Sequence, residues 1–218
     1  MNEPSVDLAA MLCSRLCHDL LSPVGAMSNG LELLATETDP QMKENCIELL
    51  EQSATISTNK LKFFRLAFGA AGGFGERVDT SEPRALIEAL AKDRGKVEVR
   101  WAVEQANLAK PAVKVLLNLA QIALDALVRG GTLDIGAEVR NGSCEMVVRA
   151  AGTKIAFDAT IGQALEGSLP PEQLSSRTAA AHMIALLAES AGGGLQFART
   201  DDALVMGAVL PEAEGMIG

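Results

Sequence analysis

Apolar residues in the first third of the chain recur at spacings that alternate between four and three positions. The main series is Cys13, Cys17, Leu20, Val24, Met27, Leu31 and Leu34. A second apolar stripe near the start of this segment consists of Leu8, Met11, Leu12 and Leu16. This spacing is the heptad pattern of helices that pack along a seam, so the stretch is predicted to be one long helix.

A second segment repeats this rhythm after a short polar turn. Its series is Ile47, Leu50, Ala54, Ser57, Leu61, Phe64 and Phe68, widened by Cys46, Leu49, Ile56 and Phe63. The turn spans residues 36–40, where Asp39 suits a helix N-cap and Pro40 the first helical position. Residues 1–70 are therefore predicted to form a helical hairpin. Its wide stripes favour a four-helix bundle built by a homodimer.

The pattern changes after residue 69. Residues 69–75 contain four glycines and are predicted to be a linker. Beyond it, helices are expected at 81–95, 110–130 and 171–190. Strands are expected at 97–103, 132–140, 144–150, 195–199 and 203–210. The fold class is thus α+β, with an α/β sandwich over residues 76–212 in which helices cover one face of a mixed sheet.

Composition narrows the functional classes. The 218 residues are 48% hydrophobic but 3% aromatic, so alanine, leucine and valine must fill the core. A formal net charge of −9 argues against nucleic-acid binding. No basic segment precedes an apolar run at the start, and the longest apolar run, 179–188, is too short to span a bilayer. Because Cys13, Cys17 and Cys46 fall on apolar helical positions, reduced thiols and a cytoplasmic location are expected.

The candidate chemistry lies in His18-Asp19-Leu20-Leu21-Ser22-Pro23-Val24 of the first helix. The heptad places His18, Asp19 and Ser22 at outer positions, so the imidazole is predicted to be exposed. A neutral imidazole can act as a nucleophile through one nitrogen, while Asp19 orients or deprotonates the other. Ser22 is expected to add an auxiliary hydrogen bond. This arrangement suits reversible phosphorylation of His18.

Three further residues on this helix support a functional face. Arg15 lies one turn before His18, and Gly25 about two turns after it, where it leaves room for a partner. Pro23 costs roughly 3 kcal/mol inside a helix, which indicates a bend near the site.

The segment His18–Pro23 resembles the H-box of the dimerisation and phosphotransfer domain of sensor histidine kinases. The wider string Cys17–Glu32 is similar to that of ChpT-type histidine phosphotransferases in alphaproteobacterial cell-cycle phosphorelays. The resemblance implies a phosphotransferase in which His18 accepts a phosphoryl group from the receiver domain of a hybrid kinase resembling CckA. Response-regulator receivers resembling CtrA and CpdR would then take it. The receiver domain would supply magnesium, and the chain itself would bind no cofactor.

The hairpin register places further basic residues near the expected docking site. In antiparallel helices of equal rise, His18 lies level with about residues 57–59. Lys60, Lys62 and Arg65 are then candidate contacts for an acidic receiver. For any single one of them, an ordinary solvated surface residue is the favoured interpretation.

The second domain resembles the Bergerat-type ATP-binding domain of histidine kinases but lacks its nucleotide-binding residues. Ile122 stands at the magnesium-binding asparagine, and Ala150 at the adenine-reading aspartate. Ala179 stands where the glycine-rich phosphate lid is expected. Isoleucine cannot ligate a hard cation, and alanines can neither accept the adenine hydrogen bond nor adopt the backbone conformations that cradle phosphates. The resemblance therefore implies no ATP binding and no ATP-dependent autophosphorylation.

Two other functions remain open from the sequence. An active sensor kinase fragment would bind ATP, and a non-catalytic dimeric scaffold would not depend on His18. A zinc site at Cys13, Cys17 and His18 is disfavoured because a structural site needs four ligands. No metal is therefore expected. His182 is expected to be a packed or surface residue, and 192–194 to cap a helix.

Overall fold

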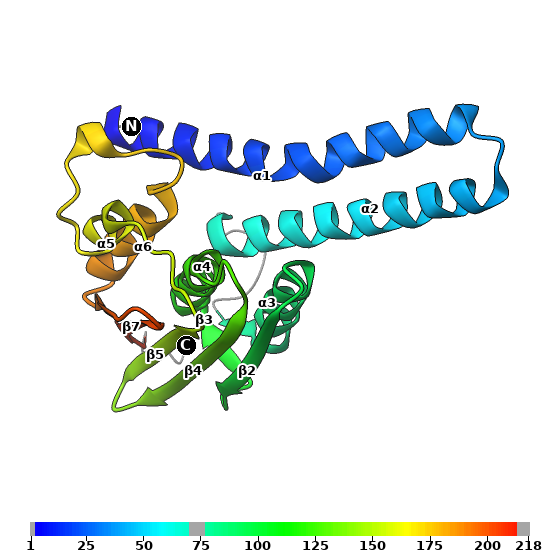
Figure 1. The fold of residues 1–218 in the computed structure, drawn as a ribbon. Coiled ribbons are helices and arrows are strands. Elements are labelled where there is room, and N and C mark those ends of the chain that lie inside the picture. Colours follow the sequence, from blue (N-terminus) through cyan, green and yellow to red (C-terminus); the bar gives the residue numbers. More distant parts are fainter. Residues whose placement is uncertain (1–2, 70–76, 213–218) are drawn as a thin grey trace, which may run out of the picture. The chain divides into compact units, whose positions relative to one another are not determined.

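The computed structural model of the chain describes residues 3–69 and 77–212 (Figure 1). It divides into two compact units, the first ending at Arg65 and the second beginning at Leu66. This division falls slightly before the expected boundary at residue 70, inside the second helix. Apart from Gly69, the segment predicted to be a linker lies outside the described residues.

The first unit is a helical hairpin. Helix α1 (Glu3–Thr36) continues through Pro23, and α2 (Pro40–Phe68) returns antiparallel to it (Figure 1). The Asp39 carboxylate accepts a hydrogen bond from the Met42 N–H at 3.0 Å. This bond confirms Asp39 as the N-cap of α2, and Pro40 is its first helical residue.

Small residues line the contact between the two helices. Pro23 and Gly30 are buried on α1, and Cys46, Ser53 and Ser57 are buried on α2. A Cβ atom added to Gly30 would lie 3.2 Å from Leu50 Cδ2. The close approach of α1 and α2 at this level therefore depends on the missing side chain of Gly30.

Only part of the predicted seam is covered within this hairpin, since Ser57 and Phe64 of the α2 series are buried. Cys13 and Cys17 are exposed, and so are Val24 at 48% and Leu31 at 59%. On α2, Ile47, at 47%, is exposed in the same way. These positions are therefore not buried within a single chain, and their burial in a homodimer stays a prediction. The reason is that α1 turns the adjacent line through Pro23 and Gly30 towards α2, which leaves these exposed seam positions facing outward.

The second unit is built on a five-stranded mixed sheet in the order β2-β4-β5-β7-β6. Its strands are β2 (Val97–Val103), β4 (Gly131–Arg140), β5 (Ser143–Ala151), β6 (Gly194–Arg199) and β7 (Ala203–Pro211). The β2–β4 pair is parallel and the other pairs are antiparallel. Strands β1 (Arg77–Asp79) and β3 (Asn107–Ala109) form a separate antiparallel pair.

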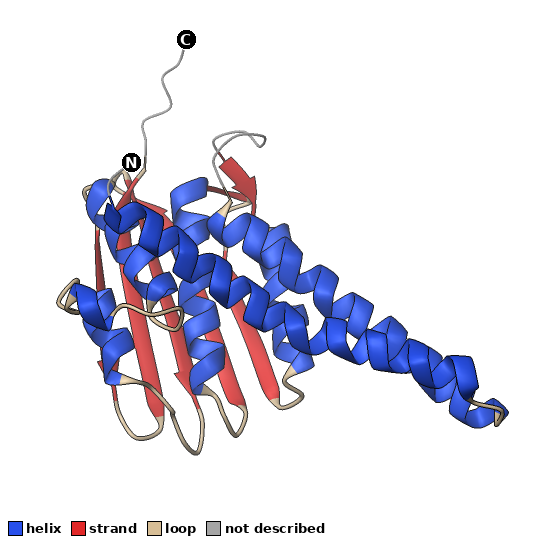
Figure 2. Ribbon diagram, turned by 90° about the horizontal axis from the view of Figure 1, so that it is seen from above, coloured by secondary structure: helices blue, strands red, loops and turns tan. Residues whose placement is uncertain are grey.

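Helices cover one face of this sheet, as the sequence predicts (Figure 2). They are α3 (Ser81–Asp93), α4 (Lys110–Ala126), α5 (Ala159–Leu165) and α6 (Ala179–Ser190), with a 3-10 turn at η1 (Pro171–Gln173). The core lies between α4 and the inner side of the central strands, where Leu116, Leu133 and Met206 are fully buried. Aliphatic side chains fill this core, as the low aromatic content requires.

The predicted helix over 171–190 is wrong in its first part. Residues 171–173 form a 3-10 turn and α6 begins at Ala179. The Thr178 hydroxyl accepts a hydrogen bond from the Ser175 N–H at 3.0 Å, a local turn that competes with the helix. Gly192 has φ of 72°, and the Gly193 N–H bonds to the Ala188 carbonyl at 2.8 Å, which confirms the predicted glycine cap. Helix α5 and the β1–β3 pair were not predicted.

Candidate functional site

His18 projects from the surface of α1. Its side chain is 87% exposed, which confirms the prediction from the heptad. Leu21, Ser22 and Gly25 are also exposed, three, four and seven residues further along the helix. Since these spacings place residues on one side of a helix, they form a continuous exposed stripe with His18. Leu21 is 69% exposed. It is not among the site residues expected from the sequence, although its spacing of three positions from His18 places it on the same side of the helix.

Asp19 holds one nitrogen of the imidazole. His18 Nδ1 lies 3.4 Å from Asp19 Oδ1. A hydrogen bond across this contact requires the proton on Nδ1, since the carboxylate accepts a hydrogen bond and cannot donate one. Nε2 then carries the unshared electron pair.

The surroundings of Asp19 differ from the prediction. Asp19 was expected at an outer position, yet its side chain is 31% exposed. Arg15 Nε lies 3.7 Å from the other carboxylate oxygen, and the Arg15 side chain is 18% exposed. The structure thus places Arg15 beside Asp19, where it was expected on the face of His18. The reason is again the orientation of α1, which turns these two residues away from the fully exposed stripe.

Lys60 of α2 reaches the same turn of α1. Its Nζ donates a hydrogen bond to the main-chain carbonyl of Asp19 at 2.7 Å. This contact confirms the predicted register between His18 and α2. Lys62 and Arg65 are exposed further along α2, and their contact with a partner stays a prediction. A Cβ atom added to Gly25 would meet no atom within 4 Å, so the helix itself does not require a glycine there.

The cysteines do not assemble a metal site. Cys13 and Cys17 are exposed, whereas Cys46 and Cys144 are buried, and all four are free thiols. Within residues 3–69 and 77–212, no three histidine, cysteine or acidic side chains come together as metal ligands would. Burial raises the pKa of Cys144 to about 11, with the Glu212 carboxylate adding to the shift and Arg77 opposing it. The Cys144 thiol is therefore a packed core group.

The three positions that replace nucleotide-binding residues lie in the core of the second unit. Ile122 is 7% exposed, and Ala150 and Ala179 are 0% exposed. Asn118, one turn before Ile122 in α4, is also buried, and its amide donates to the Lys114 carbonyl at 2.8 Å. Apolar packing therefore occupies the positions where a nucleotide site would need polar side chains.

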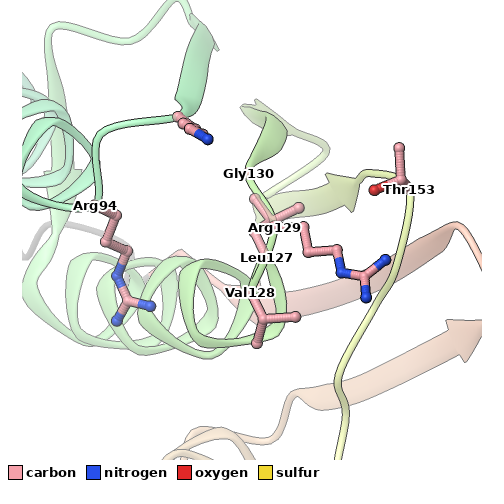
Figure 3. Close-up of a pocket in the computed structure, with 7 residues that line it drawn as sticks. Arg94, Leu127, Val128, Arg129, Gly130 and Thr153 are labelled. Atoms are coloured by element: carbon pink, nitrogen blue, oxygen red, sulfur yellow. The ribbon is translucent and has the colours of Figure 1, made fainter.

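One pocket of the second unit is basic (Figure 3). Its lining residues are Arg94, Lys96, Leu127, Val128, Arg129, Gly130 and Thr153, a set that contains none of the three replaced positions. Arg94 forms an ion pair with Asp125 and donates to the Leu124 carbonyl at 2.9 Å. Part of the positive charge of this pocket is thus already compensated by α4.

Comparison with known proteins decides the family. A family model described as the histidine phosphotransferase C-terminal domain matches residues 80–203. The protein phosphotransferase ChpT of Brucella abortus (strain 2308) is 33% identical over 204 residues, which cover 94% of this chain and 96% of that protein. The chain belongs to the histidine phosphotransferase family.

A solved structure agrees with this membership. It is described as a 1.7 Angstrom structure of a bacterial phosphotransferase and matches with a TM-score of 0.81 at 32% identity. The match covers 95% of this histidine phosphotransferase and 97% of that chain. None of the described helices of this phosphotransferase combines the length and the apolarity needed to cross a membrane.

Proposed function

We propose that this histidine phosphotransferase carries a phosphoryl group on His18 and shuttles it between aspartates of receiver domains in a multistep phosphorelay. The observation that supports this most is the 87% exposed imidazole whose Nδ1 faces Asp19. A reachable nucleophile beside a group that fixes its tautomer is what the transfer requires of this chain. Positioning and charge do most of the work in phosphoryl transfer.

The proposed transfer balances without a redox step. Nε2 of His18 attacks the phosphorus of a receiver's aspartyl phosphate. The N–P bond forms as the bond between phosphorus and the aspartyl oxygen breaks, and the receiver's carboxylate leaves. Asp19 stabilises the ring through the Nδ1–H. The second half of the relay is the reverse reaction with another receiver, whose aspartate attacks the phosphohistidine.

We place the docking surface on the exposed stripe of α1 and on the basic residues around it. Ser22 would hydrogen-bond near the phosphoryl group, and Gly25 would let the receiver approach the helix closely. Arg15, Lys60, Lys62 and Arg65 would complement an acidic receiver. The receiver would bring the magnesium ion. Receivers resembling those of CckA, CtrA and CpdR are the proposed partners, because a ChpT-named relative aligns over nearly the whole chain.

The proposal excludes autophosphorylation from ATP. Its support is that Ile122, Ala150 and Ala179 are apolar and buried. No carboxylate or amide therefore stands at the three places that contact the nucleotide in the kinases this domain resembles. A hard cation needs oxygen ligands, and an adenine amine needs an acceptor. The second unit would then help to orient the receiver.

The proposal includes a homodimer with two equivalent histidine sites and a cytoplasmic location. The heptad seam supports the dimer, since Val24, Leu31 and Ile47 are each about half exposed in the single chain. A second hairpin would bury these side chains in a four-helix bundle. Four free thiols suit a reducing compartment.

The function is tested by offering two phosphoryl donors to the purified chain. A receiver domain phosphorylated on aspartate is mixed with it in one arm, and ATP with magnesium in the other. The expected result is label from the receiver but not from ATP, lost in His18→Ala. Label from ATP would identify a kinase. A relay that still runs with His18→Ala would favour a scaffold.

A further inference from the structure

One backbone carbonyl next to His18 lacks its usual donor within the helix. In an α-helix, the carbonyl of each residue accepts a hydrogen bond from the N–H four positions later. The residue four positions after Asp19 is Pro23, which has no N–H. The helix nevertheless runs without a break from Glu3 to Thr36, and Pro23 is buried. The Asp19 carbonyl is therefore left for a donor from outside α1.

Lys60 provides this donor. Its Nζ lies 2.7 Å from the Asp19 carbonyl oxygen, although the two residues are 41 positions apart in sequence. Lys60 is half-buried, so this charge-assisted bond is partly shielded from water. Arg15 lies against the Asp19 carboxylate, 3.7 Å away. Lys60 thus contacts the main-chain carbonyl of Asp19, and Arg15 contacts its side-chain carboxylate.

We propose that Lys60 is a positioning residue for phosphoryl transfer, replacing the N–H that Pro23 lacks and fixing the turn that aims Asp19 at His18. This inference rests on the proposed role of His18 as the phosphoryl acceptor. The His18–Asp19 contact is long, at 3.4 Å, so a small movement of the Asp19 backbone would break it. Pro23 and Lys60 act as a pair. The proline leaves the Asp19 carbonyl without its helical donor, and Lys60 donates a hydrogen bond to that carbonyl from α2.

The pairing predicts a specific coupling between two substitutions. In Lys60→Met, the Asp19 carbonyl loses its donor, and transfer to His18 should slow roughly tenfold, as expected for one charge-assisted hydrogen bond. In Pro23→Ala, the new N–H of residue 23 can satisfy the same carbonyl. Adding Lys60→Met to that variant should therefore slow transfer less than about twofold further.

The experiment measures phosphorylation of His18 in the full-length chain by phosphoramidate, a small donor that needs no docking surface. Wild type, the two single variants, the double variant and Lys60→Arg are compared, with thermal unfolding recorded for each. Lys60→Arg keeps a donor and should recover most of the rate. Lys43→Met removes an exposed lysine from the same helix and should leave the rate unchanged.

Imidazole nitrogen NMR provides a second readout that a general loss of stability would not reproduce. In wild type, His18 should show the proton predominantly on Nδ1. In Lys60→Met the two tautomers should become more equal, and in the double variant the distribution should match that of Pro23→Ala. This spectrum reports on positioning even if His18 accepts no phosphoryl group, so failure of the proposed function is distinguishable.

Two results would overturn the inference. Equal rate losses from Lys60→Met in the wild-type and Pro23→Ala backgrounds would show that the lysine does not act through the open carbonyl. An unchanged phosphoramidate rate and tautomer in Lys60→Met, with a raised KM for the phosphorylated receiver, would make Lys60 a docking contact.

Discussion

Gly25 allows the demands of folding and of docking to be separated, because it is exposed in the middle of α1 and has free space around it. Replacing a glycine in a helix interior by alanine gains about 0.8–1.0 kcal/mol, since the unfolded chain loses conformational freedom. A Cβ atom at Gly25 would meet nothing within 4 Å. We therefore expect Gly25→Ala to realise the full gain per chain and to raise Tm by about 2–4 °C.

A side chain at position 25 should also weaken the relay, because we propose that the receiver approaches α1 closely at Gly25. Gly25→Leu has nearly the same helix propensity as alanine and should also stabilise the fold. Its larger side chain would obstruct a packed interface, which typically costs about 1–3 kcal/mol, or roughly 5- to 150-fold in Kd for the receiver. Stability and receiver binding should thus move in opposite directions.

Gly30 is the matched control for the folding part of this prediction. A Cβ atom there would lie 3.2 and 3.3 Å from two atoms of Leu50, so Gly30→Ala should gain less stability than Gly25→Ala, or lose some. Urea unfolding measures the stabilities, and titration with a phosphorylated receiver measures binding. The reasoning is refuted if Gly25→Leu binds the receiver as tightly as wild type, or if Gly25→Ala is no more stable.

Three further outcomes are expected. Asp19→Asn should slow transfer to His18 by roughly 100-fold in a single-turnover assay, a typical loss for a group that stabilises developing charge. Asp7→Asn, on the same helix, should not slow transfer, and an equal loss would contradict the role of Asp19. Leu31→Glu should shift sedimentation from dimer to monomer because it places a charge in the outward seam, whereas Leu33→Glu, equally exposed but outside the seam, should remain dimeric. If both variants stay dimeric, the seam is not the interface. The pKa of Cys144 is raised from 9.0 to about 11, so the folded state holds this proton more tightly than the unfolded state. Its contribution to stability should be complete below pH 9 and be lost as the pH rises through 11, and Cys144→Ala should remove that part of the pH dependence of unfolding. A profile unchanged by Cys144→Ala would contradict this.

Much of the fold could be predicted because hydrophobic spacing and helix caps are local signals. Asp39-Pro40 marks the start of α2, and alternation along 97–103 marks β2, both as observed. Helix α5 was missed because it has seven residues, too few for a clear period. The helix expected at 171–190 was too long because Ser175 and Thr178 form a turn that apolar counting does not register.

Some features of the candidate site could likewise be predicted from the sequence, and others could not. Exposure of His18 follows from the heptad, and the level of Lys60 on α2 follows from the equal rise of two antiparallel helices. The orientation of α1 does not, because two adjacent stripes compete for the inside of the hairpin, and the choice depends on the small side chains at Pro23 and Gly30. For this reason Asp19 and Arg15 are more covered than the sequence predicts. The link between Pro23 and Lys60 needed the structure, although a proline four residues after Asp19 already indicated an open carbonyl.

The most direct test of the account is to locate the phosphoryl group itself. After brief exposure to a phosphorylated receiver, the chain is digested under alkaline conditions and the label is mapped by mass spectrometry, with phosphorus NMR to distinguish the ring nitrogens. The account predicts one acid-labile phosphoryl group per chain, on Nε2 of His18. A phosphoryl group on His182 or on a serine would contradict it. So would a chain without any phosphoryl group after the receiver has lost its own.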